Sequence, residues 1–467
     1  MKRILRRSTM ILAVTLAFIG GLGFLAVELV MDAEDWVDHP YNAHISDNGG
    51  LSQAGAVLDR NDEALAQTVD GKRVYNESES VRKGLLHVVG DNSVNISTAV
   101  QSMYRSQLTG YSLVWGLNMP QSLRSSNDIK LTVDAKTCAA VYDVLSSYDK
   151  KGACVVINYE TGEVICSVST RAYDPQAPPK ITEENESEYD GVYLDNVLSS
   201  AYTPGSIFKI ITTAAAVESI PDLYERTWEC TGSKEIGGSD VTCVEAHGTI
   251  NIEQAMAHSC NIAYAELAVE IGEDKMTEIA EKAGINGSVE VDGVKTAKGL
   301  YDVSKANTNQ LAWSGVGQYN DKVNPMQMAV MCGAIANGGK SKSPTLLKDT
   351  SFLKSLGIDI NMSSDGDELF APETAQKLDE IMRYTITDYY GDNLFGGLSV
   401  CAKTGTAEVG DDKEPTAWMV GYSKDEDCPL AFACVVEEAG FGFTYAGPVA
   451  EAAMIQAAKS LGASAVQ

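Results

Sequence analysis

The hydrophobic pattern near the amino terminus predicts a membrane-spanning helix. Residues 10–27 contain no charged side chain. As a helix, this run spans roughly 27 Å at about 1.5 Å per residue, close to the roughly 30 Å hydrocarbon core of a bilayer. Basic residues precede the run and acidic residues follow it: Lys2, Arg3, Arg6 and Arg7 before, and Asp32, Glu34, Asp35 and Asp38 after.

This charge distribution predicts the orientation of the helix, because basic flanks stay in the cytoplasm. We expect a cytoplasmic tail at 1–7, a transmembrane anchor at 8–31 and an extracytoplasmic body. A cleaved signal peptide is the alternative, but no clean Ala-x-Ala site precedes Asp32, and Glu28 and Met31 fit cleavage poorly.

Beyond the anchor, apolar runs predict a sheet with flanking helices. Residues 152–168 are typical of two strands around a Glu160-Thr161-Gly162 turn. Three more strands are predicted at 398–407, 416–422 and 430–437, and helices at 207–217 and 448–460. Two strands early and three late, with helices between them, predict an α+β fold with a five-stranded antiparallel sheet flanked by helices.

Residues 32–130 show a different pattern, in which short apolar stretches alternate with turns. We expect a small β-rich module there, followed by a larger domain at 131–467. The stretch 174–194 contains two tandem prolines and many acidic residues, which predicts an exposed loop. The chain beyond the anchor is long enough for about two to three domains with ample core.

Charge limits the possible partners. The chain has 64 acidic and 36 basic residues and a formal net charge of −28 at pH 7. Nucleic acids and anionic membrane surfaces are polyanions, so we expect neither as a partner. We interpret the acidity mainly as a contribution to solubility.

Three short segments can supply the groups of an acyl-transfer site: Ser206 to Lys209, Ser259 to Asn261, and Lys403 to Thr406. Each pattern alone is common. Ser-x-x-Lys also begins at Ser80, Ser147 and Ser351, and Ser-x-Asn also recurs. Position helps to distinguish the copies: the Ser351 copy follows the Ser259 segment, only the Ser259 copy of Ser-x-Asn lies between Ser206 and Lys403, and Lys-Thr-Gly occurs once.

The local context of Ser206 suits a nucleophile. It follows a Thr203-Pro204-Gly205 turn and precedes an apolar helical run, so we expect it at a helix N-terminus, where backbone N–H groups favour a developing oxyanion. Lys209 lies one turn later on the same face. A lysine, with its ordinary pKa of about 10.4, can act as a base only if burial or nearby positive charge lowers that pKa. Lys403 is the candidate for that second cation, and a plain helix N-cap is the alternative role for Ser206.

The serine, lysine and Lys-Thr-Gly set is the signature of β-lactamases and penicillin-binding proteins. Over nearly its whole length, the sequence resembles class B penicillin-binding proteins and their transpeptidase domain. The resemblance is carried by blocks at 131–134, 152–164, 173–175, 202–206, 317–318, 325–328 and 403–408.

The resemblance implies a two-step acyl transfer through an acyl-enzyme. Ser206 would be the acylated serine and Lys209 its general base. Ser259 would relay protons to the leaving amine, and Lys403 would tune the site electrostatically.

The resemblance also implies the substrate-binding residues. Asn261 would hold the backbone of the donor peptide. Thr404, Gly405 and Thr406 would bind the donor, with the two threonines at its terminal carboxylate, while backbone N–H groups of Ser206 and Thr406 would form the oxyanion hole.

By resemblance, the donor would be the D-Ala-D-Ala end of a peptidoglycan stem peptide and the acceptor an amine on a neighbouring stem. β-Lactams would acylate Ser206 as mimics of the dipeptide, and no cofactor is expected. Residues 32–130 would serve as a pedestal and partner-contact module. The implied partner is a lipid II polymerase of the shape, elongation, division and sporulation family.

Other functions use similar motifs. A D,D-carboxypeptidase would differ only in using water as the acceptor. A class D-like β-lactamase lacks an anchored module, and a β-lactam sensor has several membrane helices. A non-enzymatic scaffold would carry a damaged serine, lysine or Lys-Thr-Gly element, and all three are intact here. About 100 residues before the catalytic domain leave no room for the glycosyltransferase domain of a class A protein.

The chain has ten cysteines, and an extracytoplasmic domain permits disulfides. Related Gram-positive proteins often carry a pair like Cys230 and Cys243, so the sequence leaves open whether these two residues form a disulfide. Most other cysteines fall in apolar runs and are expected to be buried hydrophobic residues. We expect no metal site, because no spacing of Cys and His is typical of zinc and Cys260 is the variable middle residue of Ser-x-Asn.

Overall fold

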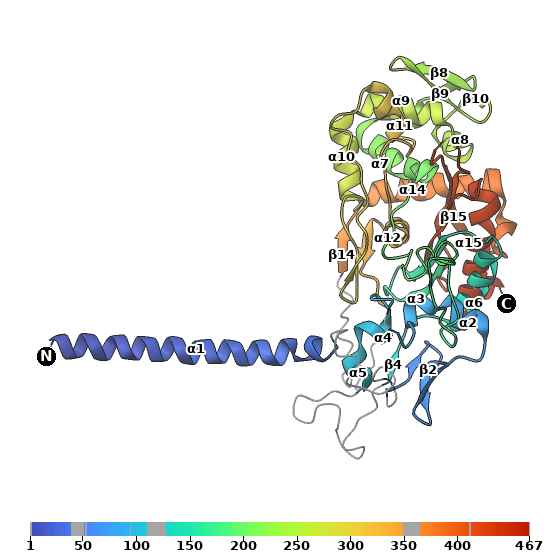
Figure 1. Ribbon diagram of the computed structural model, residues 1–467. Coiled ribbons are helices and arrows are strands. Elements are labelled where there is room, and N and C mark those ends of the chain that lie inside the picture. Colours follow the sequence, from blue (N-terminus) through green and yellow to red (C-terminus); the bar gives the residue numbers. More distant parts are fainter. Residues whose placement is uncertain are drawn as a thin grey trace.

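The computed structural model describes residues 2–38, 51, 54–93, 95–109, 128–348, 365–410 and 412–466 (Figure 1). Helix α1 (Lys2–Asp38) extends away from the folded body. Its segment Arg6–Val27 is apolar and exposed throughout, and it is the one stretch in the described part of the chain that is long and apolar enough to cross a membrane. The predicted apolar helix is confirmed.

The centre of the body is a five-stranded antiparallel sheet in the order β15-β16-β17-β5-β6. The strands are β5 (Gly152–Asn158), β6 (Val164–Thr170), β15 (Val400–Ala407), β16 (Thr416–Ser423) and β17 (Leu430–Val436). The sheet confirms the prediction from the apolar runs. It places β15, with the Lys403 segment, at one edge.

Helices cover both faces of this sheet, which explains why its strands are apolar without alternation. Helices α6 (Ala135–Ser146) and α15 (Gly442–Leu461) pack together against the sheet, and α12 (Pro325–Ala336) packs against β16, β17 and β5. Every residue of β5, β6, β16 and β17 is buried.

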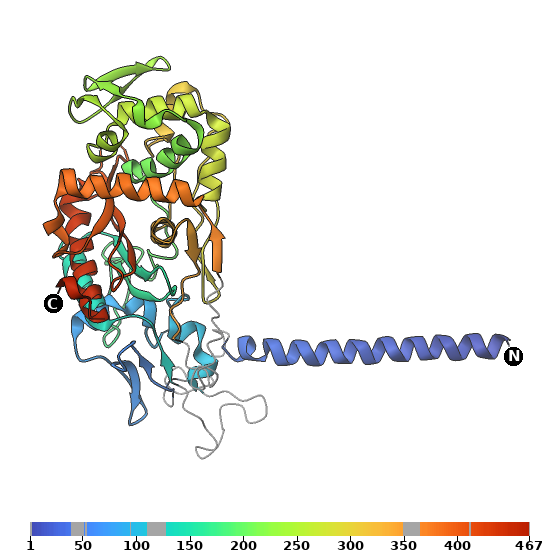
Figure 2. The same cartoon turned by 180° about the vertical axis from the view of Figure 1, so that it is seen from behind.

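A second group of helices lies beyond the edge formed by β15. It comprises α7 (Lys209–Ser219), α8 (Ile252–Ala257), α9 (Asn261–Ile271), α10 (Glu273–Lys282), α11 (Thr308–Ser314) and α14 (Pro372–Tyr384). Within this group, α14 lies along the border with the sheet, where it crosses the molecule and contacts α7, α8, α12 and β15 (Figure 2). The active-site segments therefore meet where the helical group joins the sheet edge.

Short two-stranded pairs complete this part: β7 (Trp228–Cys230) with β10 (Gly248–Ile250), β8 (Ser233–Ile236) with β9 (Ser239–Thr242), β11 (Glu290–Val291) with β12 (Val294–Lys295), and β13 (Lys340–Lys342) with β14 (Asp365–Glu368). The β8–β9 hairpin projects from the end of the molecule distant from α1 (Figure 1).

A separate four-stranded sheet, in the order β3-β2-β1-β4, forms at the other end. Its strands are β1 (Val57–Leu58), β2 (Ala64–Val69), β3 (Lys72–Tyr75) and β4 (Ile129–Lys130). Four short helices accompany it: α2 (Glu79–Gly84), α3 (Leu86–Val89), α4 (Val100–Met103) and α5 (Arg105–Thr109). Residues 174–194 contain neither helix nor strand, as predicted for a loop.

Two helix boundaries differ from the expectations. The expected helix at 207–217 begins as a 3₁₀ turn, η4 (Gly205–Phe208), and becomes α-helical at Lys209. The closing helix begins at Gly442 rather than at 448, so Pro448 lies inside it. A proline is most favourable in the first helical turn, which is why the sequence indicated a later start.

Candidate active site

Ser206 lies in the η4 turn, between β15 and the group of helices, and is partly exposed. Gly205 has a positive φ of 53°, which a glycine adopts without strain. Its N–H donates to the carbonyl of Gly317 at 3.0 Å. A β-carbon at Gly205 would lie 2.5 Å from the carbonyl oxygen of Thr406, so the missing side chain lets the serine turn approach β15 closely.

Lys209 is fully buried at the start of α7, and its amine contacts three other candidate site residues. Nζ lies 3.0 Å from Ser206 Oγ, 3.0 Å from Ser259 Oγ and 2.8 Å from Asn261 Oδ1. It also donates to the carbonyl of Ser259 at 2.7 Å. One amine therefore connects the hydroxyls of two serines that are far apart in the sequence.

Lys403 is also fully buried, on β15, and donates to Ser259 Oγ at 3.1 Å and to the carbonyl of Thr404 at 2.9 Å. Burial lowers the pKa of Lys209 to about 7. Burial, and then the charge of Lys209, hold the pKa of Lys403 well below its usual range. Two ammonium groups on one hydroxyl would repel each other, so a neutral amine is available near neutral pH.

Ser259 and Asn261 lie in the tight connection between α8 and α9. Ser259 has a left-handed φ of 56°, a conformation that side chains rarely adopt without support. Asn261 begins α9, and its side-chain amide donates to the carbonyl of Thr242 at 2.7 Å. The connection therefore aims both polar side chains at Lys209.

The Lys-Thr-Gly segment runs along β15 beside the serine turn. A β-carbon at Gly405 would lie 2.8 Å from the carbonyl oxygen of Pro204, so this position also requires a glycine. Thr406 Oγ1 accepts a hydrogen bond from the N–H of Gly442 at 3.1 Å. The eight predicted site residues thus lie in three neighbouring segments, and Lys209 joins two of them directly.

The part of the chain that carries this candidate site matches a known family. The model of the penicillin-binding protein transpeptidase domain matches residues 152–455, well over half of the chain. The chain belongs to this family. The match covers Ser206, Ser259 and Lys403, and the prediction of a class B penicillin-binding protein is confirmed.

Curated relatives are distant in sequence. The peptidoglycan D,D-transpeptidase PbpA of Mycolicibacterium smegmatis is 26% identical over 62% of this chain and 62% of its own length. The stage V sporulation protein D of Bacillus subtilis is 25% identical over 82% of this chain and 64% of its own length. The chain thus spans less than two thirds of the length of these relatives.

Solved structures of this family share the fold. The ceftriaxone acyl-enzyme complex of penicillin-binding protein A from M. tuberculosis has a TM-score of 0.73 at 22% identity, over 88% of this chain and all of that chain. A D,D-transpeptidase domain from Eggerthella lenta has a TM-score of 0.69 at 24% identity, over 88% of this chain and 97% of that chain. With the apolar α1 helix, family membership indicates a membrane-anchored penicillin-binding protein.

Sequence reasoning missed other residues around this candidate site. The hydroxyl of Tyr390, at the end of η6 (Thr385–Tyr390), forms a short hydrogen bond with the Thr404 hydroxyl. The Tyr264 ring lies beneath Lys209, with Nζ 5.5 Å from its centroid. Gln318 Nε2 donates to the carbonyl of Thr406 at 3.4 Å. Gln318 fell in a resembling block, but nothing in the local sequence distinguishes either tyrosine.

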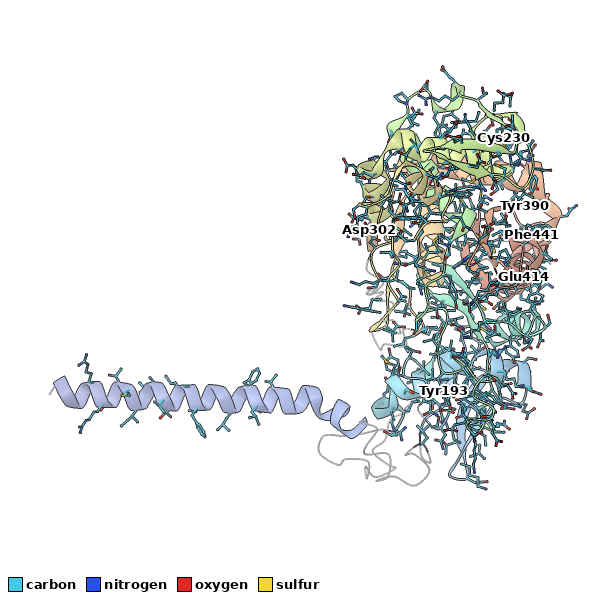
Figure 3. The ribbon with its side chains drawn as sticks, turned by 45° about the horizontal axis from the view of Figure 1, so that its top comes forward. Tyr193, Cys230, Asp302, Tyr390, Glu414 and Phe441 are labelled. Atoms are coloured by element: carbon cyan, nitrogen blue, oxygen red, sulfur yellow. The ribbon has the colours of Figure 1, made fainter. Side chains whose placement is uncertain are left out.

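Exposed aromatic side chains border the site beside Tyr390. The Tyr390 ring stacks on Phe443, with centroids 5.1 Å apart, and its edge meets Tyr389. Phe443 is 45% and Phe441 61% exposed. Figure 3 shows Tyr390 and Phe441 on the same side of the molecule. These rings provide an apolar border next to the threonines of β15.

Gly317 provides a test of the packing behind Ser206. Its φ is 85°, and a β-carbon there would lie 2.2 Å from the carbonyl oxygen of Gly205. Gly284 has the same φ but open space around it, so it is a matched control. We expect Gly284→Ala to lower the free energy of unfolding by about 1–2 kcal/mol through backbone conformation alone. Gly317→Ala should lower it by about 3 kcal/mol or more, because the clash adds to that cost.

Thermal unfolding of both variants in detergent, followed by circular dichroism, measures this difference. Gly317→Ala should also slow benzylpenicillin acylation, since the clash displaces the turn that carries Ser206. Equal losses of stability in the two variants would contradict the assigned contact between Gly317 and Gly205.

Proposed function

We propose that this penicillin-binding protein is a peptidoglycan D,D-transpeptidase that cross-links stem peptides through an acyl-enzyme on Ser206. The observation that carries the proposal is the position of Lys209 Nζ, 3.0 Å from both Ser206 Oγ and Ser259 Oγ. This amine can accept the proton of one serine and return it through the other.

In the first step, neutral Lys209 removes the Ser206 proton while Oγ attacks the carbonyl carbon of the penultimate D-Ala. The backbone N–H groups of Ser206 and Thr406 would hold the oxyanion. The C–N bond then breaks, and the leaving D-Ala amine receives its proton through Ser259 from Lys209. The product of this step is an ester on Ser206.

In the second step, an amine of a neighbouring stem attacks the ester, and its proton returns to Ser206 Oγ along the same path. Asn261 would hold the donor backbone, and Thr404 and Thr406, spaced by Gly405, would hold its terminal carboxylate. Lys403 would keep the potential positive beside Ser259. β-Lactams would acylate Ser206 by the same first step.

The membrane topology is part of this proposal. Basic residues before the apolar segment favour a cytoplasmic amino terminus, which would place the catalytic domain outside, where peptidoglycan is cross-linked. We divide the chain into a tail at 1–7, an anchor at 8–31, a pedestal module at 32–130 and a transpeptidase domain at 131–467. The pairing of β4 with β1 supports the boundary near 130, because β4 still belongs to the smaller sheet. The module would contact a lipid II polymerase.

Product analysis tests the reaction. The full-length chain in detergent is incubated with a stem pentapeptide ending in D-Ala-D-Ala and an excess of a second stem carrying a free amine. We expect a cross-linked product and released D-Ala, both absent with Ser206→Ala. A hydrolysed tetrapeptide without any cross-link would show a D,D-carboxypeptidase instead.

A further inference from the structure

A cluster of metal-binding side chains lies behind the Ser259 connection. The ligand atoms of Cys230, Cys243, His247 and Cys260 all lie within 4.8 Å of one another. Cys230 and Cys260 are buried, and Cys243 and His247 are partly exposed. The four residues come from separate places: Cys230 ends β7, Cys243 follows β9, His247 precedes β10 and Cys260 caps α9.

Three of the distances within the cluster are close to those of a tetrahedral zinc site. Zinc–thiolate bonds of about 2.3 Å at tetrahedral angles place two sulfurs about 3.8 Å apart, and a sulfur and a histidine nitrogen about 3.5 Å apart. The Sγ atoms of Cys230 and Cys243 are 3.7 Å apart, and those of Cys243 and Cys260 are 3.8 Å apart. Cys230 Sγ lies 3.3 Å from His247 Nδ1.

Backbone donors around the sulfurs suit thiolate ligands. The N–H of Asn261 donates to Cys243 Sγ at 3.2 Å, and the N–H of Ala263 donates to Cys260 Sγ at 3.5 Å. Both donors belong to the first turn of α9, whose positive dipole end stabilises negative charge. Such outer contacts orient metal ligands and favour their charged form.

The segment around the cluster has little core of its own and would be stabilised by a cross-link. Between Cys230 and Ile250 few side chains are buried, and the β8–β9 hairpin contributes only Ile236 and Val241 to the interior. On its own, a two-stranded hairpin with so little core is marginal in water, and this one depends on its contacts with α9 and α11. A Cys230–Cys243 disulfide would join only two positions and would leave His247 and Cys260 without a role. In addition, all ten cysteines are free thiols in this structure. A metal ion uses all four residues.

We propose that Cys230, Cys243, His247 and Cys260 bind one zinc ion in a closed structural site. Three sulfurs and one imidazole in tetrahedral arrangement favour zinc over magnesium or calcium, which prefer oxygen ligands. Four protein ligands leave no open position for water, so the ion has no direct part in acyl transfer. The sequence indicated no metal because these four residues have no zinc-like spacing along the chain, and only the fold brings their ligand atoms together.

The zinc ion positions the Ser259 connection. Cys260 separates Ser259 from Asn261, and Cys243 accepts the N–H of Asn261, so two of the four ligands directly constrain the segment that meets Lys209. Removing zinc should slow benzylpenicillin acylation by up to about 10²-fold, the loss that a displacement near 1 Å can produce. This consequence rests on the proposed function, whereas zinc binding itself does not.

Metal content tests the site. The tag-free full-length chain is purified in detergent without chelator, and its zinc is measured by inductively coupled plasma mass spectrometry. We expect one zinc per chain in the wild type and in the control Cys428→Ser, which changes a buried cysteine outside the cluster, and only traces in Cys243→Ser and His247→Gln. Cobalt added to the stripped wild type should give thiolate-to-cobalt charge-transfer absorption. Circular dichroism checks that each variant is folded.

If the ligand variants fail to fold, the metal content of the wild type alone tests whether the protein binds zinc. A zinc-free wild type that takes up no cobalt would overturn the proposal, whether alkylation and intact mass then find Cys230 and Cys243 joined by a disulfide or find every thiol free. For the positioning role, stripping followed by zinc addition should lower and then restore the acylation rate without a change in circular dichroism. An acylation rate that zinc does not affect would overturn that role and leave the metal site standing.

Discussion

Ser206→Ala is expected to abolish the covalent benzylpenicillin adduct completely. The variant lacks the hydroxyl that forms the ester. Ser259 also lies beside Lys209, but its hydroxyl contacts Lys403 as well and has the proposed role of proton relay. The measurement is the intact mass of the full-length chain after incubation with benzylpenicillin. The wild type should carry one long-lived adduct per chain.

Ser80→Ala is the matched control, because Ser80 also begins a Ser-x-x-Lys sequence. Ser80 lies in α2, far from the candidate active site in sequence and in the fold. Its hydroxyl donates to the Asp143 carboxylate at 2.6 Å. This variant should be acylated like the wild type. Persistence of the adduct in Ser206→Ala would overturn the assignment of the nucleophile, and rapid turnover of benzylpenicillin by the wild type would point to a β-lactamase.

Lys209→Met is expected to slow acylation by about 10²- to 10⁴-fold, the usual contribution of a general base. Methionine keeps much of the apolar stem but cannot accept the Ser206 proton. Lys83→Met, in the other Ser-x-x-Lys copy, is the control. Lys83 pairs with Glu79 at the surface, so its loss should leave acylation unchanged.

The pH dependence of acylation tests the same role. Burial lowers the pKa of Lys209 to about 7, and only the neutral amine can accept a proton. The rate constant should therefore fall about tenfold per pH unit below that pKa and reach a plateau above it. Stopped-flow acylation between pH 5.5 and pH 8.5, values about 1.5 units on either side of that pKa, measures the profile. A wild-type acylation rate that is constant over this range would contradict Lys209 as the base. The same rise of the rate with pH in Lys209→Met would also contradict it.

The sheet was predictable from the sequence because its strands are buried on both faces. Such strands are continuous apolar runs, and β5, β6, β16 and β17 lie close to the predicted ranges. The predicted ends of the helices were less accurate. Pro448 suggested a start that the chain does not use, and the 3₁₀ turn at Ser206 has no distinct sequence signal.

The site was predictable where chemistry is concentrated in a short motif. Ser206 and Lys209 share a turn, and the order of the motifs along the chain identified Ser259 and Lys403. Tyr390 was missed because its contact with Thr404 depends on the course of η6 after α14. The Cys230 cluster was missed for the same physical reason, since pairing of β7 with β10 and the β8–β9 hairpin bring its members together.

The Ser206 acyl-enzyme is tested by locating the benzylpenicillin adduct on the wild-type chain. The full-length protein is acylated with benzylpenicillin, denatured and digested, and the modified peptide is sequenced by tandem mass spectrometry. We expect a single modified residue, Ser206. An adduct on any other residue, or no adduct at all, would contradict a Ser206 acyl-enzyme.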